Sequence, residues 1–359
     1  MQNFEGPRSP KNEEFKSLIS FLDSNLRNDV KWSIADEYPT TYALENLSNL
    51  RIIKDGESVL SHAALKSEIV RTHFGLFKVA AIGGVVTSKE HRAQGLSGKI
   101  LENCLALAQK EAHDIAILWT NLYDHYRKLG FELAGTEVAI IIDKPFLNEP
   151  STNLNFIKGF QVSSEAIERV YSQHSVISLR KASDIARYLQ IPNSNIYTAW
   201  NKKSGQLVAY AVEGKGSDLS GYIHEWGGGV SELISLFNYI SGDQMRKLAI
   251  ISPAHSENLI RQLKPYASNI NVGFLGMIKI LNRENIVGKI QKQAMKMEIK
   301  DLVSQNFIDL LLSLDEKVLT QIVFGPHDAK VLSAIPQEFR ESVKKLLPMA
   351  FWIWGWDSV

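Results

Sequence analysis

The chain has 359 residues, of which 45% are hydrophobic and 22% are charged. This length exceeds the size at which one hydrophobic core usually keeps growing, so we expect two globular units and an appendage, and the apolar content excludes global disorder. The 40 basic and 39 acidic residues give a net charge of +1, which disfavours nucleic acid as a partner.

The sequence shows no pattern typical of a targeting or membrane-spanning segment. Residues 1–11 contain Pro7 and Pro10 and no apolar segment of the kind found in secretory signals. The longest apolar stretch, 346–356, is shorter than the ~20 residues that a membrane-spanning helix needs, and it contains Pro348. We therefore expect a cytoplasmic protein.

Apolar spacing predicts the elements of the first half, beginning with an amphipathic helix over 12–26. Asp55-Gly56 is typical of a tight hairpin, so antiparallel strands are expected on either side of it, over 51–53 and 58–65. The β-branched run 77–87 predicts a strand, in which Gly83-Gly84 indicates a bulge or a close approach of backbone to ligand. The pattern then predicts a helix over 96–110, a strand over 114–120, a short helix over 123–129 and a strand over 137–143.

The only cysteine, Cys104, falls on the apolar face of the predicted helix 96–110, beside Leu101 and Leu105. It has no partner in the chain for a disulfide. We predict a core residue rather than a reactive thiol.

The segment 148–155 contains Pro150 and is typical of a linker, so we expect a domain boundary there. The second half begins like the first, which makes a diverged duplication a reasonable hypothesis. Its pattern predicts helices over 164–173 and 182–189, strands over 196–200, 207–213 and 222–225, a glycine turn over 227–229, a helix over 233–240, and strands over 248–252 and 274–281. The predicted domains are 1–147, 156–282 and a C-terminal appendage, 283–359.

The strongest motif is the segment from Arg92 to Lys99, between the predicted strand 77–87 and the predicted helix 96–110. Free backbone amides and the positive end of the helix dipole form an anion site, and glycines let a phosphate approach closely. The motif therefore predicts a pyrophosphate-binding turn. The alternative is an ordinary helix start that contains glycine.

A second motif, Tyr126-Arg127-Lys128-Leu129-Gly130-Phe131, follows the next predicted strand. The two motifs in this order resemble the GNAT acetyltransferases, whose signatures are Q/R-x-x-G-x-G/A and Tyr-x-x-x-Gly-Phe. Arg92 and Gly95 match the first signature, and Ser97 replaces its final small residue. The alternative for Tyr126 is a plain aromatic packing residue.

The resemblance implies a mixed, mostly antiparallel sheet flanked by helices, with acetyl-CoA as cosubstrate and an amine as acceptor. It implies that Tyr126 protonates the departing thiolate and that a backbone N–H freed at the bulge near Gly84 stabilises the oxyanion. The coenzyme-binding residues that it implies are Val85, Val86, Thr87, Arg92, Ala93, Gln94, Gly95, Leu96, Ser97, Gly98, Lys99 and Asn121.

No general base is assigned. His62, Glu68 and His73 lie on or next to strands that should border the site, but each is also typical of a surface residue. No histidine or cysteine spacing predicts a metal site. The acceptor, a small molecule or a protein amine, and the oligomeric state stay open.

The glycine segment Trp226 to Val230 also precedes a predicted helix, but it lacks the arginine and no second tyrosine motif follows it. We interpret it as a structural turn in a degenerate GNAT-like domain. The whole layout, tandem GNAT-like domains with a helical or α+β appendage, loosely resembles the enhanced intracellular survival acetyltransferases. The alternative function is a non-catalytic acetyl-CoA sensor or a protein-interaction module.

The last residues contain Trp352, Trp354 and Trp356 and are too apolar for a free tail, so we expect this segment to be docked. A sharper hypothesis, which follows from the looser resemblance, is that docking brings the Val359 carboxylate to the acceptor side of the site. A carboxylate there could accept the amine's proton, although α-carboxyl groups with a pKa of about 3.5 are weak bases unless desolvated.

Overall fold

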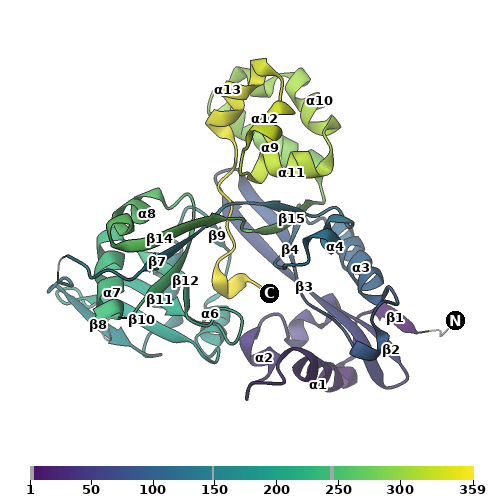
Figure 1. The fold of residues 1–359 in the computed structure, drawn as a ribbon, viewed down its shortest axis with the longest axis horizontal. Helices are drawn as coiled ribbons and strands as arrows, with labels where there is room; N and C mark the ends of the chain where they lie inside the picture. The colour runs from purple at the N-terminus through teal and green to yellow at the C-terminus, as the bar shows by residue number, and fades with distance from the viewer. Residues whose placement is uncertain (1–3, 148, 243–245) are drawn as a thin grey trace. The chain divides into compact units, whose positions relative to one another are not determined.

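The computed structural model describes residues 4–147, 149–242 and 246–359, which form two compact units (Figure 1). One unit comprises Met1–Gly135, Phe274–Phe351 and Val359, and the other comprises Thr136–Gly273 and Trp352–Ser358. Each unit contains one mixed sheet flanked by helices, as the predicted fold class requires.

The sheet of the first unit has the strand order β1-β2-β3-β4-β5-β15-β6. Its neighbouring strands are antiparallel, except that β4 and β5 are parallel. The hairpin predicted at Asp55-Gly56 is confirmed between β2 and β3. The strands are β1 (Glu5–Arg8), β2 (Leu50–Asp55), β3 (Ser58–Thr72), β4 (Gly75–Thr87), β5 (Ile115–Leu118), β6 (Glu132–Ala134) and β15 (Gly276–Ile280).

Helices cover both faces of this sheet because β2 and β3 alternate apolar residues between the faces. Ile52 packs in one cluster with Leu18 and Leu22 of α1 (Phe15–Leu26), to which α2 (Ile34–Glu37) also contributes. Ile53 packs in another cluster with Ile100 of α3 (Leu96–Lys110). Both predicted helices, 12–26 and 96–110, are thereby confirmed, the first with a 3-10 turn at its start.

Cys104 lies in the α3 cluster and is fully buried. Burial raises the pKa of its thiol to about 12, so the group stays protonated near neutral pH. The prediction of a core residue is confirmed.

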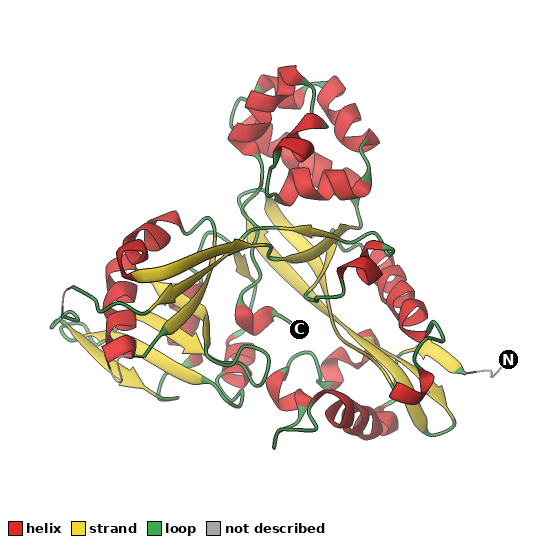
Figure 2. Ribbon diagram, viewed as in Figure 1, coloured by secondary structure: helices red, strands yellow, loops and turns green. Residues whose placement is uncertain are grey.

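Residues 283–346 of the first unit, which belong to the predicted appendage 283–359, form mainly helices joined by loops, drawn as a group of red helices in Figure 2. Among the described residues, every helix of the protein is too short or too polar to cross a bilayer. The appendage helices are α9 (Arg283–Lys296), α10 (Gln305–Ser313), α11 (Glu316–Phe324), α12 (Ala329–Ser333) and α13 (Gln337–Leu346).

The sheet of the second unit has the order β14-β7-β13-β12-β11-β10-β8, with β12 and β13 parallel. Its strands are β7 (Glu137–Ile142), β8 (Leu154–Lys158), β10 (Asn195–Asn201), β11 (Leu207–Glu213), β12 (Tyr222–Gly228), β13 (Leu248–Pro253) and β14 (Ala267–Gly273). The unit also contains β9 (Ile177–Ser178), α5 (Ser164–Tyr171), α6 (Ala182–Tyr188), α7 (Val230–Gly242) and α8 (Glu257–Leu263).

Two strands join different sheets from those expected. β7, expected in the first domain, pairs with β13 and β14, whereas β15, expected in the second, pairs with β5 and β6. Both strands are apolar runs that suit a central position in either sheet, so their sequences do not specify the partner. The predicted limits 1–147, 156–282 and 283–359 therefore do not coincide with the two compact units.

The segment from Trp226 to Gly228 is not a turn but the end of β12, paired with β11. A Cβ on Gly227 would lie 2.7 Å from the ring of Tyr210, so glycine is needed there for side chains of neighbouring elements to pack. The helix α7 begins only at Val230.

The docking of the C-terminal segment is confirmed, because Trp352, Trp354 and Trp356 are each at most 2% exposed. The second unit holds Trp352–Ser358 with two buried cations. Lys215 Nζ donates to the main-chain oxygens of Gly355 and Ser358, at 2.8 and 2.7 Å.

The second cation, Arg180, is fully enclosed between two carboxylates of the same unit. Its Nη1 lies 2.8 Å from Glu225 Oε1 and its Nη2 lies 2.7 Å from Asp357 Oδ2. The pKa of the Glu225 carboxyl is raised by burial, and Arg180 opposes that shift. The guanidinium therefore compensates two buried carboxylates at once.

We predict that Arg180→Leu destabilises the second unit by about 3–5 kcal/mol, because it leaves Glu225 and Asp357 buried without their cation. Denaturant unfolding followed by tryptophan fluorescence measures this change. Arg261→Leu, at an exposed position of α8, is the control and should change stability by less than about 0.5 kcal/mol. Equal stabilities for the two variants would contradict this account of the tail.

Candidate functional site

In the first unit, the parallel strands β4 and β5 pair over three residues and then part. The paired residues are Val79 to Ala81 on β4 and Ile115 to Ile117 on β5. From Ile82 to Thr87, β4 continues along β3, and its other edge forms no further pair with the described residues of β5. An open strand edge of this kind can bind an extended ligand through main-chain hydrogen bonds.

A β-bulge interrupts β4 within this open stretch. The register passes from the pair Ala64–Gly83 to the pair His62–Val86, so Gly84 and Val85 together oppose one residue of β3. Gly84 has a φ of +57°, and a side chain on it would collide with the hydroxyl of Tyr42. The bulge predicted from Gly83-Gly84 is confirmed.

His62, which pairs with Val86 next to the bulge, is completely buried, and its Nδ1 lies 2.8 Å from the Gly84 carbonyl oxygen. Burial lowers the pKa of His62 to about 4, so its ring is neutral near pH 7. The ring centroid of Tyr42 lies 5.8 Å away. Tyr42 lies in an irregular segment far from either motif, so no sequence pattern pointed to it.

The helix α3 begins at an open glycine turn. Gly95 is the N-cap with a φ of +76°, and neither Gly95 nor Gly98 has a heavy atom within 4 Å of where a Cβ would lie. The first amides of an α-helix have no partner within it, and Arg92 and Lys99 beside them are exposed. The turn thus combines open space, free donors and positive charge, the features that a pyrophosphate requires.

Tyr126 lies on the short helix α4 (Tyr123–Arg127) and packs in the same cluster as Ile82 of β4 and Leu96 of α3. Its ring makes an edge contact with Phe131, at 6.1 Å between centroids. The residue is 7% exposed, and burial raises the pKa of its phenol. The group therefore stays protonated at neutral pH.

Other predicted coenzyme ligands lie at the end of β4, in the turn before α3 and after β5. Val85 is half-buried at the bulge, Val86 is buried, and Thr87 Oγ1 lies 2.9 Å from Ser61 Oγ. Arg92 Nε donates to the Thr87 carbonyl oxygen at 3.4 Å, and Asn121 is exposed after β5. Their roles as coenzyme ligands stay a prediction.

Of the three residues considered as bases, only His62 lies at the bulge. Glu68 is buried, and its Oε1 forms an ion pair with Lys66, at 2.7 Å from Nζ. His73 is exposed in the turn between β3 and β4, at the other end of the hairpin. A pKa of about 4 makes His62 itself a poor acceptor for the proton of an ammonium.

Val359 belongs to the first unit and lies beside Gly83. A Cβ on Gly83 would be 2.5 Å from the main-chain carbon of Val359 and 2.8 Å from its oxygen. Position 83 therefore has no room for a side chain. The proposed role of the Val359 carboxylate stays a prediction.

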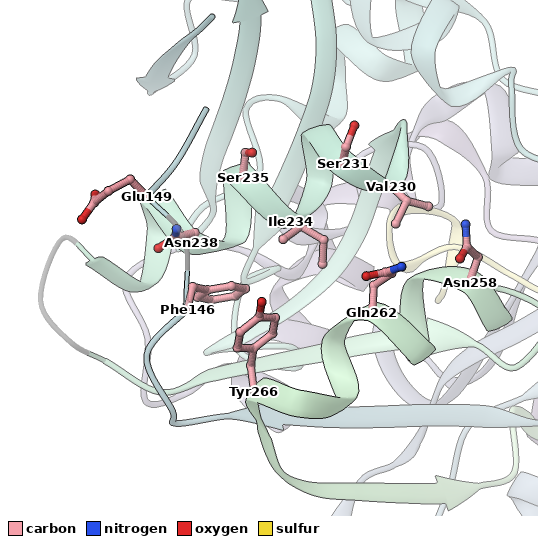
Figure 3. Close-up of a pocket in the computed structure, with 10 residues that line it drawn as sticks. All are labelled: Phe146, Glu149, Val230, Ser231, Ile234, Ser235, Asn238, Asn258, Gln262 and Tyr266. Atoms are coloured by element: carbon pink, nitrogen blue, oxygen red, sulfur yellow. The ribbon is translucent and has the colours of Figure 1, made fainter. Parts of the chain in front are cut away.

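The second unit has a separate hollow of about 450 Å³ between α7 and α8 (Figure 3). The rings of Phe146 and Tyr266 lie 4.4 Å apart along one side of it. Hydroxyl and amide side chains line the rest together with Val230 and Ile234, and among its described lining residues Glu149 is the one charged group. The hollow thus offers no positive charge to a pyrophosphate, in contrast to the start of α3.

Comparisons with known proteins relate the first unit to one family. A family model described as an acetyltransferase (GNAT) domain matches residues 8–134, a range that contains the bulge, the open helix start and Tyr126. No curated protein shows significant similarity to the chain.

Solved structures share the fold at low sequence identity. A conserved protein from Enterococcus faecalis V583 has 17% identity and a TM-score of 0.62, over 79% of this chain and 74% of that one. A GCN5-related N-acetyltransferase from Kribbella flavida has 15% identity and a TM-score of 0.58, over 78% and 71%. Eis1 from Mycobacterium abscessus has 10% identity and a TM-score of 0.55, over 79% and 75%. These likenesses confirm the expected tandem fold.

We predict that Gly95→Glu abolishes binding of acetyl-CoA, because the new carboxylate would fill the open turn and repel the pyrophosphate. Calorimetric titration measures the loss. Gly56→Glu is a matched control, since Gly56 also has a positive φ, +55°, and open surroundings but lies in the β2–β3 hairpin. Tight binding by folded Gly95→Glu would refute this placement of the coenzyme.

Proposed function

We propose that this chain, in which residues 8–134 form an acetyltransferase domain of the GNAT family, transfers the acetyl group of acetyl-CoA to an amine. The observation that carries the proposal is the order of parts along β4 and α3. An open strand edge with a bulge at Gly84–Val85 leads within ten residues to the open helix start at Gly95. An extended molecule with a pyrophosphate at one end and a thioester at the other matches these parts.

The open edge of β4 would bind the pantetheine arm through main-chain groups between Ile82 and Thr87. The free amides at the start of α3, together with Arg92 and Lys99, would bind the pyrophosphate. The thioester would then lie near the bulge, where Val85 is displaced from the regular ladder and its N–H can meet the carbonyl oxygen.

At the carbonyl carbon, the reaction forms one carbon–nitrogen bond and breaks one carbon–sulfur bond. The amine nitrogen attacks the carbonyl carbon, and negative charge develops on the oxygen that the bulge amide would stabilise. When the intermediate collapses, the carbon–sulfur bond breaks and the thiolate takes a proton from the Tyr126 hydroxyl, which its raised pKa keeps protonated beforehand. The amine's proton would pass to solvent water, since we assign no described residue as its acceptor, and the Tyr126 phenolate would regain a proton from water before the next turnover.

A sensor that only binds acetyl-CoA is the second class of function. Such a protein would need the open edge and the helix start but no acid close to them. The clustering of Tyr126 with Ile82 and Leu96 supports the enzyme. Release of free coenzyme A upon addition of small primary amines, amino acids or peptides distinguishes the two classes.

We expect Tyr126→Phe to keep the affinity for acetyl-CoA and to slow turnover by about 10²-fold or more, because only the acidic hydroxyl is removed. Steady-state release of coenzyme A, with a competent amine and under conditions where chemistry limits the rate, measures the change.

The control is Tyr123→Phe, which removes a hydroxyl from an exposed position on the same helix and should leave turnover unchanged. If Tyr126→Phe and Tyr123→Phe were equally active, another group or water would have to protonate the thiolate.

A further inference from the structure

His62 is a buried polar residue to which the mechanism above gives no role. It is 0% exposed, and its Nε2 has no hydrogen-bond partner among the described residues. An unpaired buried polar atom is destabilising, and such groups call for an explanation. An apolar residue of similar size would bury no unpaired polar atom. We therefore look for the role of His62 in its other nitrogen, Nδ1.

That nitrogen, Nδ1, lies 2.8 Å from the carbonyl oxygen of Gly84. A carbonyl oxygen only accepts hydrogen bonds, so Nδ1 carries the proton and donates it. Burial lowers the pKa of His62 to about 4, and the ring therefore holds this one proton near neutral pH. The bond thus fixes the tautomer of the histidine and the direction of the Gly84 carbonyl.

The direction of that carbonyl sets the direction of the next amide. In a planar trans peptide the C=O and the following N–H point in opposite directions, so the Val85 N–H points away from His62. His62 contacts Tyr42, which packs with α1, whereas Leu96 at the start of α3 packs on the opposite face of the sheet. The Val85 N–H is therefore directed to the face that carries the open helix start.

Glycine at position 84 makes this peptide easy to rotate. Its φ of +57° lies in a region that glycine enters freely, and in a bulge the ladder no longer holds the plane. The Tyr42 hydroxyl, close to where a Cβ would be, limits the space on that side of Gly84. The hydrogen bond from His62 Nδ1 to the Gly84 carbonyl oxygen favours one orientation of this peptide.

We infer that His62 is a positioning residue, whose Nδ1–H···O=C bond to Gly84 holds the Gly84–Val85 peptide so that the Val85 N–H donates to the thioester carbonyl oxygen of acetyl-CoA. This inference rests on the proposed function. His62 acts through the peptide, touches no reacting atom, and exchanges no proton during turnover.

Infrared difference spectroscopy of acetyl-CoA carrying a ¹³C-labelled acetyl carbonyl, bound to the full chain without an acceptor amine, tests the inference directly. A hydrogen bond to the carbonyl oxygen lowers its stretching frequency, so wild type should shift the band below that of free acetyl-CoA. In His62→Leu the band should return most of the way to the free value, because the peptide is no longer held.

His62→Asn is the rescue variant, since its Nδ2 is attached to Cγ as the histidine Nδ1 is and can donate to the same carbonyl. We expect it to retain most of the shift. If His62→Leu fails to fold, His62→Gln replaces it, because its amide lies one bond further from Cβ and should not restore the shift.

Kinetics give a second readout. The loss of an aligned oxyanion donor should lower kcat of His62→Leu by about 10- to 100-fold, with KM for acetyl-CoA within a factor of about two of wild type. A fall in kcat with an unchanged carbonyl band would overturn the inference and leave His62 a structural residue. Unchanged kcat and band would overturn it equally.

Failure of the proposed function has a different signature. If wild type bound no acetyl-CoA, there would be no thioester band to shift, and the proposed function would fall together with this inference. If wild type bound acetyl-CoA and released coenzyme A with an amine while His62→Leu matched it in both readouts, only the role of His62 would be lost.

Discussion

The parting of β4 from β5 after three paired residues is the constraint on which the account of this protein depends. A parallel pair that ends early leaves main-chain donors and acceptors of β4 without ladder partners, and they must be satisfied by water or by a ligand. The bulge at Gly84–Val85 then displaces one amide from the regular pattern at the same edge. Eight residues separate the end of β4 at Thr87 from the start of α3 at Leu96, so the free amides of the helix follow the bulge closely in the chain.

The second unit serves a different purpose in this account. Its hollow between α7 and α8 lacks positive charge among its described lining residues. The space beside Gly227 of β12 is filled by side chains, and the space beside Gly228 is filled by Val208 and Ala209 of β11. What this unit does hold firmly is the segment Trp352–Ser358, through Arg180 and Lys215. The two buried cations and the three buried tryptophans hold this short segment in one conformation within the unit.

Sequence reasoning predicted what depends on local pattern. The apolar face of 96–110 predicted both ends of α3 correctly, and Gly83-Gly84 predicted the bulge. Both signals are contained in a few neighbouring residues. It did not predict the exchange of β7 and β15 between sheets, because apolar strands suit either sheet. Nor could it show that His62 bonds to Gly84: alternation along β3 gives the face of a residue, but not which main-chain oxygen its ring meets.

Hydrogen exchange of the main-chain amides tests the central claim most directly. Acetyl-CoA should slow the exchange of amides in Ile82–Thr87 of β4 and in Leu96–Lys99 at the start of α3, and should leave those at the start of α7 unchanged. Protection confined to the second unit, or no protection at either segment of the first at saturating acetyl-CoA, would contradict the account.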